Sequence, residues 1–143
     1  MVKRCLEIKK GFVELDEFDK KERLVLNYGH TFGHVIESIT NHIIPHGIAV
    51  SMGMDIANYI SMKKDYIDNN LYSEINSVIK ELCHDIEHQK FDVREFIEIL
   101  KKDKKNINEN IMCVLTKGTG DMFLEEIALS EMNVYLKEYA NSC

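Results

Sequence analysis

The sequence contains a single proline, Pro45, in 143 residues. Proline breaks helices and also disfavours helical backbone at the residue before it, so most of this chain is free to form long helices. The same residue predicts a helix boundary, with one helix ending near His42 and another beginning just after Pro45. With 45% hydrophobic and 29% charged residues, the chain is expected to form a mainly helical, ordered domain.

Length, charge and cysteine content indicate the number of domains, the kind of partner and the cellular compartment to expect. A chain of 143 residues fits one domain with one core. Its 18 basic and 24 acidic residues give a net charge of -6, which disfavours nucleic acid as a general partner. No segment has the ~18 to 20 uncharged residues of a membrane span, and the charged N-terminal segment does not resemble a secretion signal. Four widely spaced cysteines without a C-x-x-C pair fit a reducing cytoplasm.

Hydrophobic periodicity predicts helices on both sides of the proline. Apolar residues recur at three- and four-residue steps over residues 2–15 and again over residues 68–86. Asp92, followed three residues later by Glu95, resembles a capping box and predicts a helix over residues 91–103.

The last part of the sequence changes its period. The β-prone runs at 111–115 and 122–127 flank a turn in which Gly118 and Gly120 supply the conformations that a hairpin needs. We therefore expect one short β-hairpin. Ser130 is then expected to cap a closing helix.

The least polar part of the chain, residues 24–62, carries His30, His34 and His46. If this segment is helical, His30 and His34 lie on one helix face, and His46 returns to them after the turn at Pro45. Three neutral imidazoles suit Zn²⁺, and Co²⁺ or Fe²⁺ is chemically compatible. Histidine pairs at this spacing are also common as structural residues, so a metal site and a structural pair both remain open.

Glycines at positions 29, 33, 47 and 53 interrupt the same segment. Each costs about 1 kcal/mol relative to alanine inside a helix, which indicates either a ligand close to the backbone or a close helix crossing. The sequence has no nucleophile elbow and no Walker A motif, and the GTG at 118–120 lacks the context of a dinucleotide fingerprint. We therefore do not expect this chain alone to bind a nucleotide.

Several of these motifs together resemble one known family. NYGHTFGHVIES at 27–38, followed by PHGIAVSMGM at 45–54, strongly resembles the histidine region of 3-dehydroquinate synthase and its relatives, the sugar-phosphate cyclases. RCLEIK at 4–9 and KDKK at 102–105 fall in the family's order. The resemblance implies that residues 1–143 form one bundle-like helical domain with a short hairpin, similar to the C-terminal domain of a two-domain enzyme. The N-terminal domain, outside this chain, would bind NAD⁺ and supply a carboxylate metal ligand, and the intact enzyme would be a homodimer.

The resemblance also assigns roles to the histidines. His30 and His46 match two ligands of a divalent metal, Zn²⁺ or Co²⁺, whereas His34 matches a histidine that contacts the substrate phosphate and transfers protons. Two imidazoles and one carboxylate leave a coordination position open for substrate oxygens, as in a catalytic rather than a structural metal site.

The remaining matched residues are polar or charged. Lys9 and Arg23 match positions that hold the carboxylate and hydroxyl region of the substrate. Asn27 and one of Lys104 and Lys105 match phosphate contacts. Cationic side chains of this kind suit an acidic sugar phosphate even in a chain of negative net charge, because attraction depends on the local field.

The implied activity is that of a cytoplasmic phosphorus–oxygen lyase of the shikimate pathway, which serves aromatic amino acid biosynthesis. It would eliminate phosphate from a sugar phosphate such as 3-deoxy-arabino-heptulosonate 7-phosphate and cyclise the product, using NAD⁺ and a metal. Three positions depart from the family pattern. Asp19 stands at a catalytic position where glutamate is common, Lys21 at a usual glycine, and Ile48 at a usual glutamate.

These departures keep other readings open. A cyclase for another sugar phosphate, of the 2-deoxy-scyllo-inosose or valiolone type, is expected about as strongly as the dehydroquinate-forming enzyme. The alternatives from other classes are a domain of a metal-dependent polyol dehydrogenase and a non-catalytic, truncated helical module.

Overall fold

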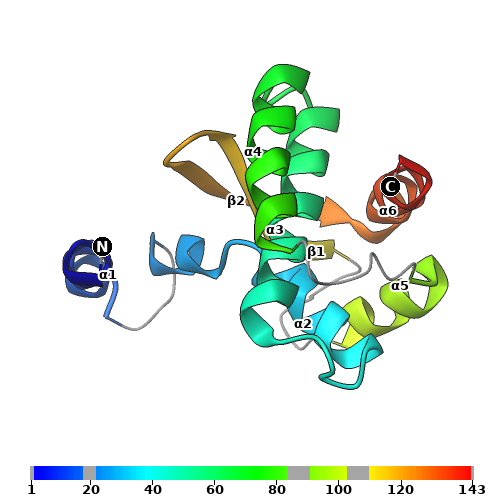
Figure 1. Ribbon diagram of the computed structural model, residues 1–143, viewed down its shortest axis with the longest axis horizontal. Coiled ribbons are helices and arrows are strands. Elements are labelled where there is room, and N and C mark those ends of the chain that lie inside the picture. The colour runs from blue at the N-terminus through cyan, green and yellow to red at the C-terminus, as the bar shows by residue number, and fades with distance from the viewer. Residues whose placement is uncertain (1, 18–21, 84–90, 103–109, 143) are drawn as a thin grey trace.

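The computed structural model describes residues 2–17, 22–83, 91–102 and 110–142. These residues form six α-helices, a 3₁₀ helix and an antiparallel hairpin (Figure 1), which confirms the mainly helical class. None of the described helices is both long enough and apolar enough to cross a membrane. In chain order the elements are α1 (Val2–Leu15), η1 (Glu22–Asn27), α2 (His30–Ile39), α3 (His46–Lys63), α4 (Asn69–Leu82), α5 (Val93–Lys102), β1 (Asn110–Gly118), β2 (Asp121–Ala128) and α6 (Leu129–Ser142).

Helices α2 and α3 pack closely because three glycines face one another. Gly29, just before α2, has a φ of 78°, which glycine adopts without steric cost. A Cβ atom on Gly53 would lie 2.1 Å from the Gly29 carbonyl oxygen and 2.7 Å from the Gly33 nitrogen. A close helix crossing therefore explains these three glycines, whereas the Cβ position of Gly47 faces open space.

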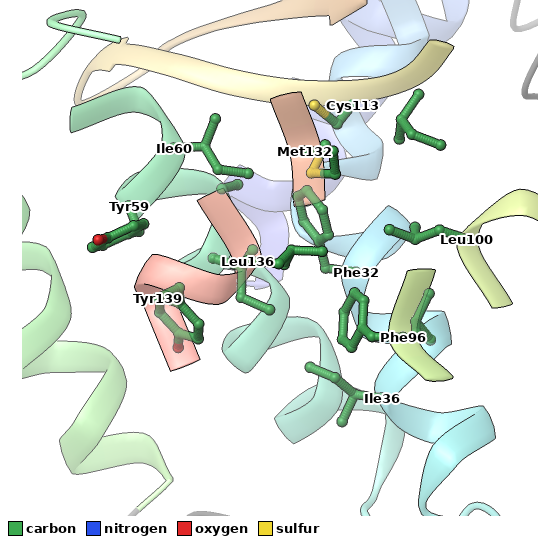
Figure 2. Packing of buried hydrophobic residues seen from close by; sticks show 14 of the residues in the cluster. Phe32, Ile36, Tyr59, Ile60, Phe96, Leu100, Cys113, Met132, Leu136 and Tyr139 are labelled. Atoms are coloured by element: carbon green, nitrogen blue, oxygen red, sulfur yellow. The ribbon is translucent and has the colours of Figure 1, made fainter. Parts of the chain in front are cut away.

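One apolar core forms around α3 (Figure 2). Phe32 of α2 packs against Phe96 of α5, with ring centroids 6.5 Å apart, and Leu136 of α6 is fully buried beside them. The centre of α3 is buried on all sides rather than on one face. Residues 55–61 are all buried, because α2, α4, β1 and α6 surround the helix.

The hairpin is confirmed, and it is anchored to α3. Strands β1 and β2 pair antiparallel, with a register shift between Thr116 and Gly118. Gly118 and Gly120 have φ values of 148° and 83° at the turn. The backbone nitrogen of Thr116 donates a hydrogen bond of 3.1 Å to the buried Ser61 hydroxyl, so β1 is fixed against the centre of the domain.

The boundary between α2 and α3 differs slightly from the prediction. Helix α3 begins at His46, directly after Pro45, as expected. Helix α2 ends at Ile39 rather than near His42, because Asn41 and His42 have positive φ angles of 49° and 58°. Backbone in this left-handed region cannot continue a right-handed helix.

The starts of α5 and α6 also test the capping predictions. The side chain of Asp92 accepts a hydrogen bond of 2.8 Å from the Arg94 nitrogen, which confirms an acidic cap before α5. The cap predicted at Ser130 was wrong. Helix α6 begins at Leu129, directly after the end of β2, so Ser130 already lies inside the helix.

Helix α1 lies to one side of the rest of the domain (Figure 1). It packs mainly against η1, and none of its residues is buried. Its apolar residues Val2, Leu6 and Leu15 are 72%, 62% and 77% exposed. The helix was predicted as amphipathic, and its apolar side is largely uncovered.

Candidate functional site

The three predicted histidines come together at the starts of two helices. His30 is the first residue of α2 and follows the left-handed Gly29, while His46 is the first residue of α3 and follows Pro45. The His30 ring centroid lies 5.7 Å from that of His34 and 5.4 Å from that of His46. The His34 and His46 centroids are 6.0 Å apart. The glycine-mediated crossing of α2 and α3 thus brings the three imidazoles within reach of a common point.

Two of these rings are held through their Nδ1 atoms. Nδ1 of His30 lies 3.3 Å from the carbonyl oxygen of Tyr28, and Nδ1 of His46 lies 3.1 Å from Oε1 of Glu37. Both partners are acceptors, so Nδ1 is the donor in each pair, and in the neutral form of each ring Nε2 carries the lone pair. This is the usual state of a histidine that binds metal through Nε2.

His34 differs from the other two histidines. It is exposed, and no hydrogen-bond partner of its ring is found among residues 2–17, 22–83, 91–102 and 110–142. A ring without such a hydrogen bond keeps both nitrogens available to an incoming ligand or proton. His34 is therefore adjacent to His30 and His46 but lacks the hydrogen bond at Nδ1 that orients each of them.

Tyr28 connects the site to the core of the domain. Its hydroxyl donates to Oδ1 of Asn58, which lies fully buried in α3. Burial raises the pKa of Tyr28 to about 12, with a smaller opposing effect from the hydrogen bond to Asn58. Tyr28 thus stays protonated at ordinary pH, and its backbone carbonyl faces His30 from an anchored position.

A cleft opens beside His30, between α1 and η1. It has a volume of about 480 Å³ and is lined by Lys9, Arg23, Asn27 and His30, together with Cys5, Ile8 and Leu26. Among the described residues that line it there are two cations and no carboxylate. The guanidinium of Arg23 is steadied by a hydrogen bond of 3.4 Å from Nη1 to the Glu17 carbonyl oxygen. This arrangement favours an anionic ligand.

Asp19, Lys104 and Lys105 lie outside the described residues, so their assigned roles stay predictions.

One contact in this site was missed at the level of sequence. Glu37 follows His34 by three residues and His30 by seven, so all three lie along one stripe of α2. That spacing was the available signal. Ligand atoms of His34, Glu37 and His46 all lie within 4.8 Å of one another, which is compatible with binding a cation.

Fold and site together define a class of protein, a helical domain with a histidine centre at two helix starts beside a cationic cleft. Residues 1–106 match the family model described as 3-dehydroquinate synthase C-terminal. The chain belongs to this family.

Curated relatives agree with this assignment. The chain is 34% identical over 142 residues to the 3-dehydroquinate synthase of Alkaliphilus metalliredigens, covering 97% of this chain and 39% of that protein. It is 38% identical over 125 residues to the 3-dehydroquinate synthase of Clostridium perfringens, covering 87% of this chain and 36% of that protein. The chain thus spans about two fifths of the length of these relatives.

A solved structure supports the fold. The chain is similar to 2-deoxy-scyllo-inosose synthase complexed with carbaglucose-6-phosphate, NAD⁺ and Co²⁺, with a TM-score of 0.83 and 24% identity. The match covers 96% of this chain and 39% of that one.

Proposed function

We propose that this chain is the metal- and phosphate-binding domain of a 3-dehydroquinate synthase-like sugar-phosphate cyclase. The observation that carries the proposal is the convergence of His30, His34 and His46 next to a cleft that contains Lys9 and Arg23. The complete enzyme would also require an NAD-binding domain, since relatives are much longer than this chain.

The donor set fits a divalent metal. The hydrogen bonds at Nδ1 of His30 and His46 keep the ring proton on Nδ1, so that Nε2 is the free ligand atom of each neutral ring. Neutral imidazoles are good ligands for Zn²⁺ and Co²⁺. These two residues would hold the ion together with a carboxylate from the NAD-binding domain. When bound, the ion supplies Lewis-acid polarisation of substrate oxygens and NAD⁺ supplies reversible hydride acceptance.

His34 would contact the substrate phosphate and move a proton. Its exposed ring lies 5.7 Å from His30 and 6.0 Å from His46, measured between centroids, so it adjoins the metal position without being anchored as they are. An imidazole with two available nitrogens can take a proton at one and donate one from the other.

The cleft would bind the remainder of the substrate. Lys9 and Arg23 provide charge for a carboxylate and hydroxyl region, and Asn27, which lines the same cleft, provides a neutral donor for phosphate oxygens. Asp19 as a base and Lys104 or Lys105 as a phosphate contact complete the proposed set. Holding an anion at both ends orients the carbon atoms that react.

The relatives favour a substrate of the dehydroquinate-forming type, 3-deoxy-arabino-heptulosonate 7-phosphate. Their identities of 34% and 38% exceed the 24% identity to 2-deoxy-scyllo-inosose synthase. The substrate is tested by assembling the chain with the NAD-binding domain of a relative and measuring phosphate release. Release from 3-deoxy-arabino-heptulosonate 7-phosphate but not from glucose 6-phosphate supports this choice, and the reverse preference contradicts it.

The site itself is tested in the 143-residue chain by titration with Co²⁺ and inorganic phosphate, followed by NMR. His30→Ala and His46→Ala should each weaken Co²⁺ binding about tenfold or more, since each removes a ligand. His34→Ala should weaken phosphate binding and leave Co²⁺ binding nearly unchanged. Equal Co²⁺ binding by the wild type and the His30 and His46 variants would refute the metal assignment.

A further inference from the structure

The carboxylate of Glu37 contacts His46 from the protein side of the site. Glu37 lies on α2, while His46 begins α3, so the contact of 3.1 Å crosses the helix pair. The side chain of Glu37 is 13% exposed and that of His46 is 56% exposed. The better-fixed partner is therefore the carboxylate, and the imidazole takes its orientation from it.

This contact accounts for a carboxylate that is otherwise costly to bury. A mostly buried carboxylate normally pairs with Lys or Arg. Within the described ranges, the only ion-pair partner of Glu37 is the His46 ring. Among the described residues, the Glu37 carboxylate therefore pairs with His46 and not with a group of several charged side chains.

We infer that Glu37 is a positioning residue for His46, and this inference rests on the proposed metal-binding function. By accepting a hydrogen bond from Nδ1–H of His46, Glu37 selects the tautomer whose Nε2 lone pair is available to a cation. The Tyr28 carbonyl does the same for His30, at 3.3 Å. The two ligand histidines are therefore oriented by different acceptors, one from the backbone and one from a side chain.

The compact grouping of His34, Glu37 and His46 allows a competing arrangement in which Glu37 binds the ion directly. In that arrangement Oε1 would bind the cation in place of the Nδ1 proton of His46. The geometry favours the positioning role, because Oε1 of Glu37 lies at a hydrogen-bond distance of 3.1 Å from Nδ1 of His46. The two arrangements predict different effects of the His34 and His30 substitutions.

The first measurement is the tautomer of His46 in the metal-free chain, read from the ¹⁵N shifts of its ring at a pH where the ring is neutral. The wild type should show the Nδ1–H tautomer. Glu37→Ala should shift the population toward Nε2–H, and Glu37→Gln, which is isosteric and keeps an acceptor oxygen, should largely restore Nδ1–H. A role limited to stability would not change the tautomer.

The second measurement is Co²⁺ binding by the same samples. Glu37→Ala should weaken Co²⁺ about 10- to 100-fold, the usual effect of removing such a partner, and Glu37→Gln should weaken it less. Glu74→Ala is the control, because it removes an exposed carboxylate on α4 and should change neither the tautomer nor Co²⁺ affinity.

An unchanged His46 tautomer and Co²⁺ affinity in Glu37→Ala would overturn the inference. So would a loss of Co²⁺ binding in His34→Ala equal to that in Glu37→Ala while His30→Ala binds normally, since Glu37 would then be a ligand. A tautomer that responds to Glu37→Ala, in a chain that binds no Co²⁺ even after assembly with the NAD-binding domain of a relative, would support the positioning contact and refute the proposed metal function.

Discussion

Replacing Gly53 with alanine tests whether the glycine crossing of α2 and α3 determines the structure. The new Cβ would lie 2.1 Å from the Gly29 carbonyl oxygen and 2.7 Å from the Gly33 nitrogen. Both neighbours are backbone atoms, so relief requires the backbones to separate by about 1.3 Å, from 2.1 Å to the 3.4 Å at which ordinary contact begins. Overpacking in a core costs about 1 to 3 kcal/mol, and a clash with backbone belongs at the upper end of that range.

Higher helix propensity offsets part of this cost, by up to about 1 kcal/mol for Gly→Ala. We therefore expect Gly53→Ala to lose about 2 kcal/mol in the free energy of unfolding, which lowers the urea midpoint by about 1 M for a small domain. Separation of the helices would also move His30 away from His46, so Co²⁺ affinity should fall in parallel.

The matched control is Gly47→Ala in the same helix. The Cβ position of Gly47 has no heavy atom within 4 Å, so only helix propensity changes, and the urea midpoint should stay constant or rise. Urea unfolding followed by circular dichroism measures both variants. A Gly53→Ala variant as stable as the wild type, or a Gly47→Ala variant equally destabilised, would refute the crossing as the reason for the glycines.

Four further predictions concern substrate binding, catalytic activity, thiol labelling and the pH dependence of stability. In an assembled enzyme, Arg23→Ala should weaken substrate binding by about 1.5 to 3 kcal/mol, the scale of a lost charged hydrogen bond, with an unchanged unfolding midpoint. Unaltered kinetics would remove Arg23 from the substrate site. The 143-residue chain alone should show no cyclase turnover with NAD⁺ and Co²⁺, because it carries no dinucleotide fingerprint, and turnover by protein free of any partner would contradict the two-domain proposal. Burial raises the pKa of the Cys113 thiol to about 12, whereas Cys5 is exposed, so iodoacetamide should label Cys5 well before Cys113. Since the folded pKa of Cys113 is raised above its ordinary value of 9.0, the stability it contributes below that pH is lost as pH rises toward 12. Cys113→Val should reduce the loss of unfolding free energy over that alkaline range, and an identical pH profile would count against the assignment.

The sequence predicted the helical segments and the shared helix face of His30 and His34 because both depend on local rules. The approach of His46 to these two residues also depends on how α2 and α3 cross. The spacing of His30 and His34 determines that they share a helix face, and Pro45 starts the helix that carries His46. The family resemblance then assigned His34 a different role, as a phosphate contact, from the metal-ligand role of the other two histidines. The structure adds a physical difference, since His30 and His46 have acceptors at Nδ1.

The contacts that were not predicted depend on how α2 and α3 cross. The spacing of Glu37 marks its helix face but not its partner, which lies on another helix. The burial of α3 on nearly all sides was missed for the same reason, since a single-helix pattern does not show how many neighbours surround it. The early end of α2 depends on the left-handed backbone of Asn41 and His42, for which the residue types give only a weak preference.

The position of α1 has a consequence for how tightly the cleft binds. Lys9 and Cys5 line the cleft from a helix that has no buried residue, and segments with few buried contacts open at low free energy, well below global unfolding. When α1 opens, Lys9 leaves the cleft while Arg23 and Asn27 remain on η1. The apparent dissociation constant of an anion is then the intrinsic value divided by the fraction of molecules with α1 closed. Any contact that covers the apolar side of α1 would raise that fraction, so it would tighten anion binding without touching the anion.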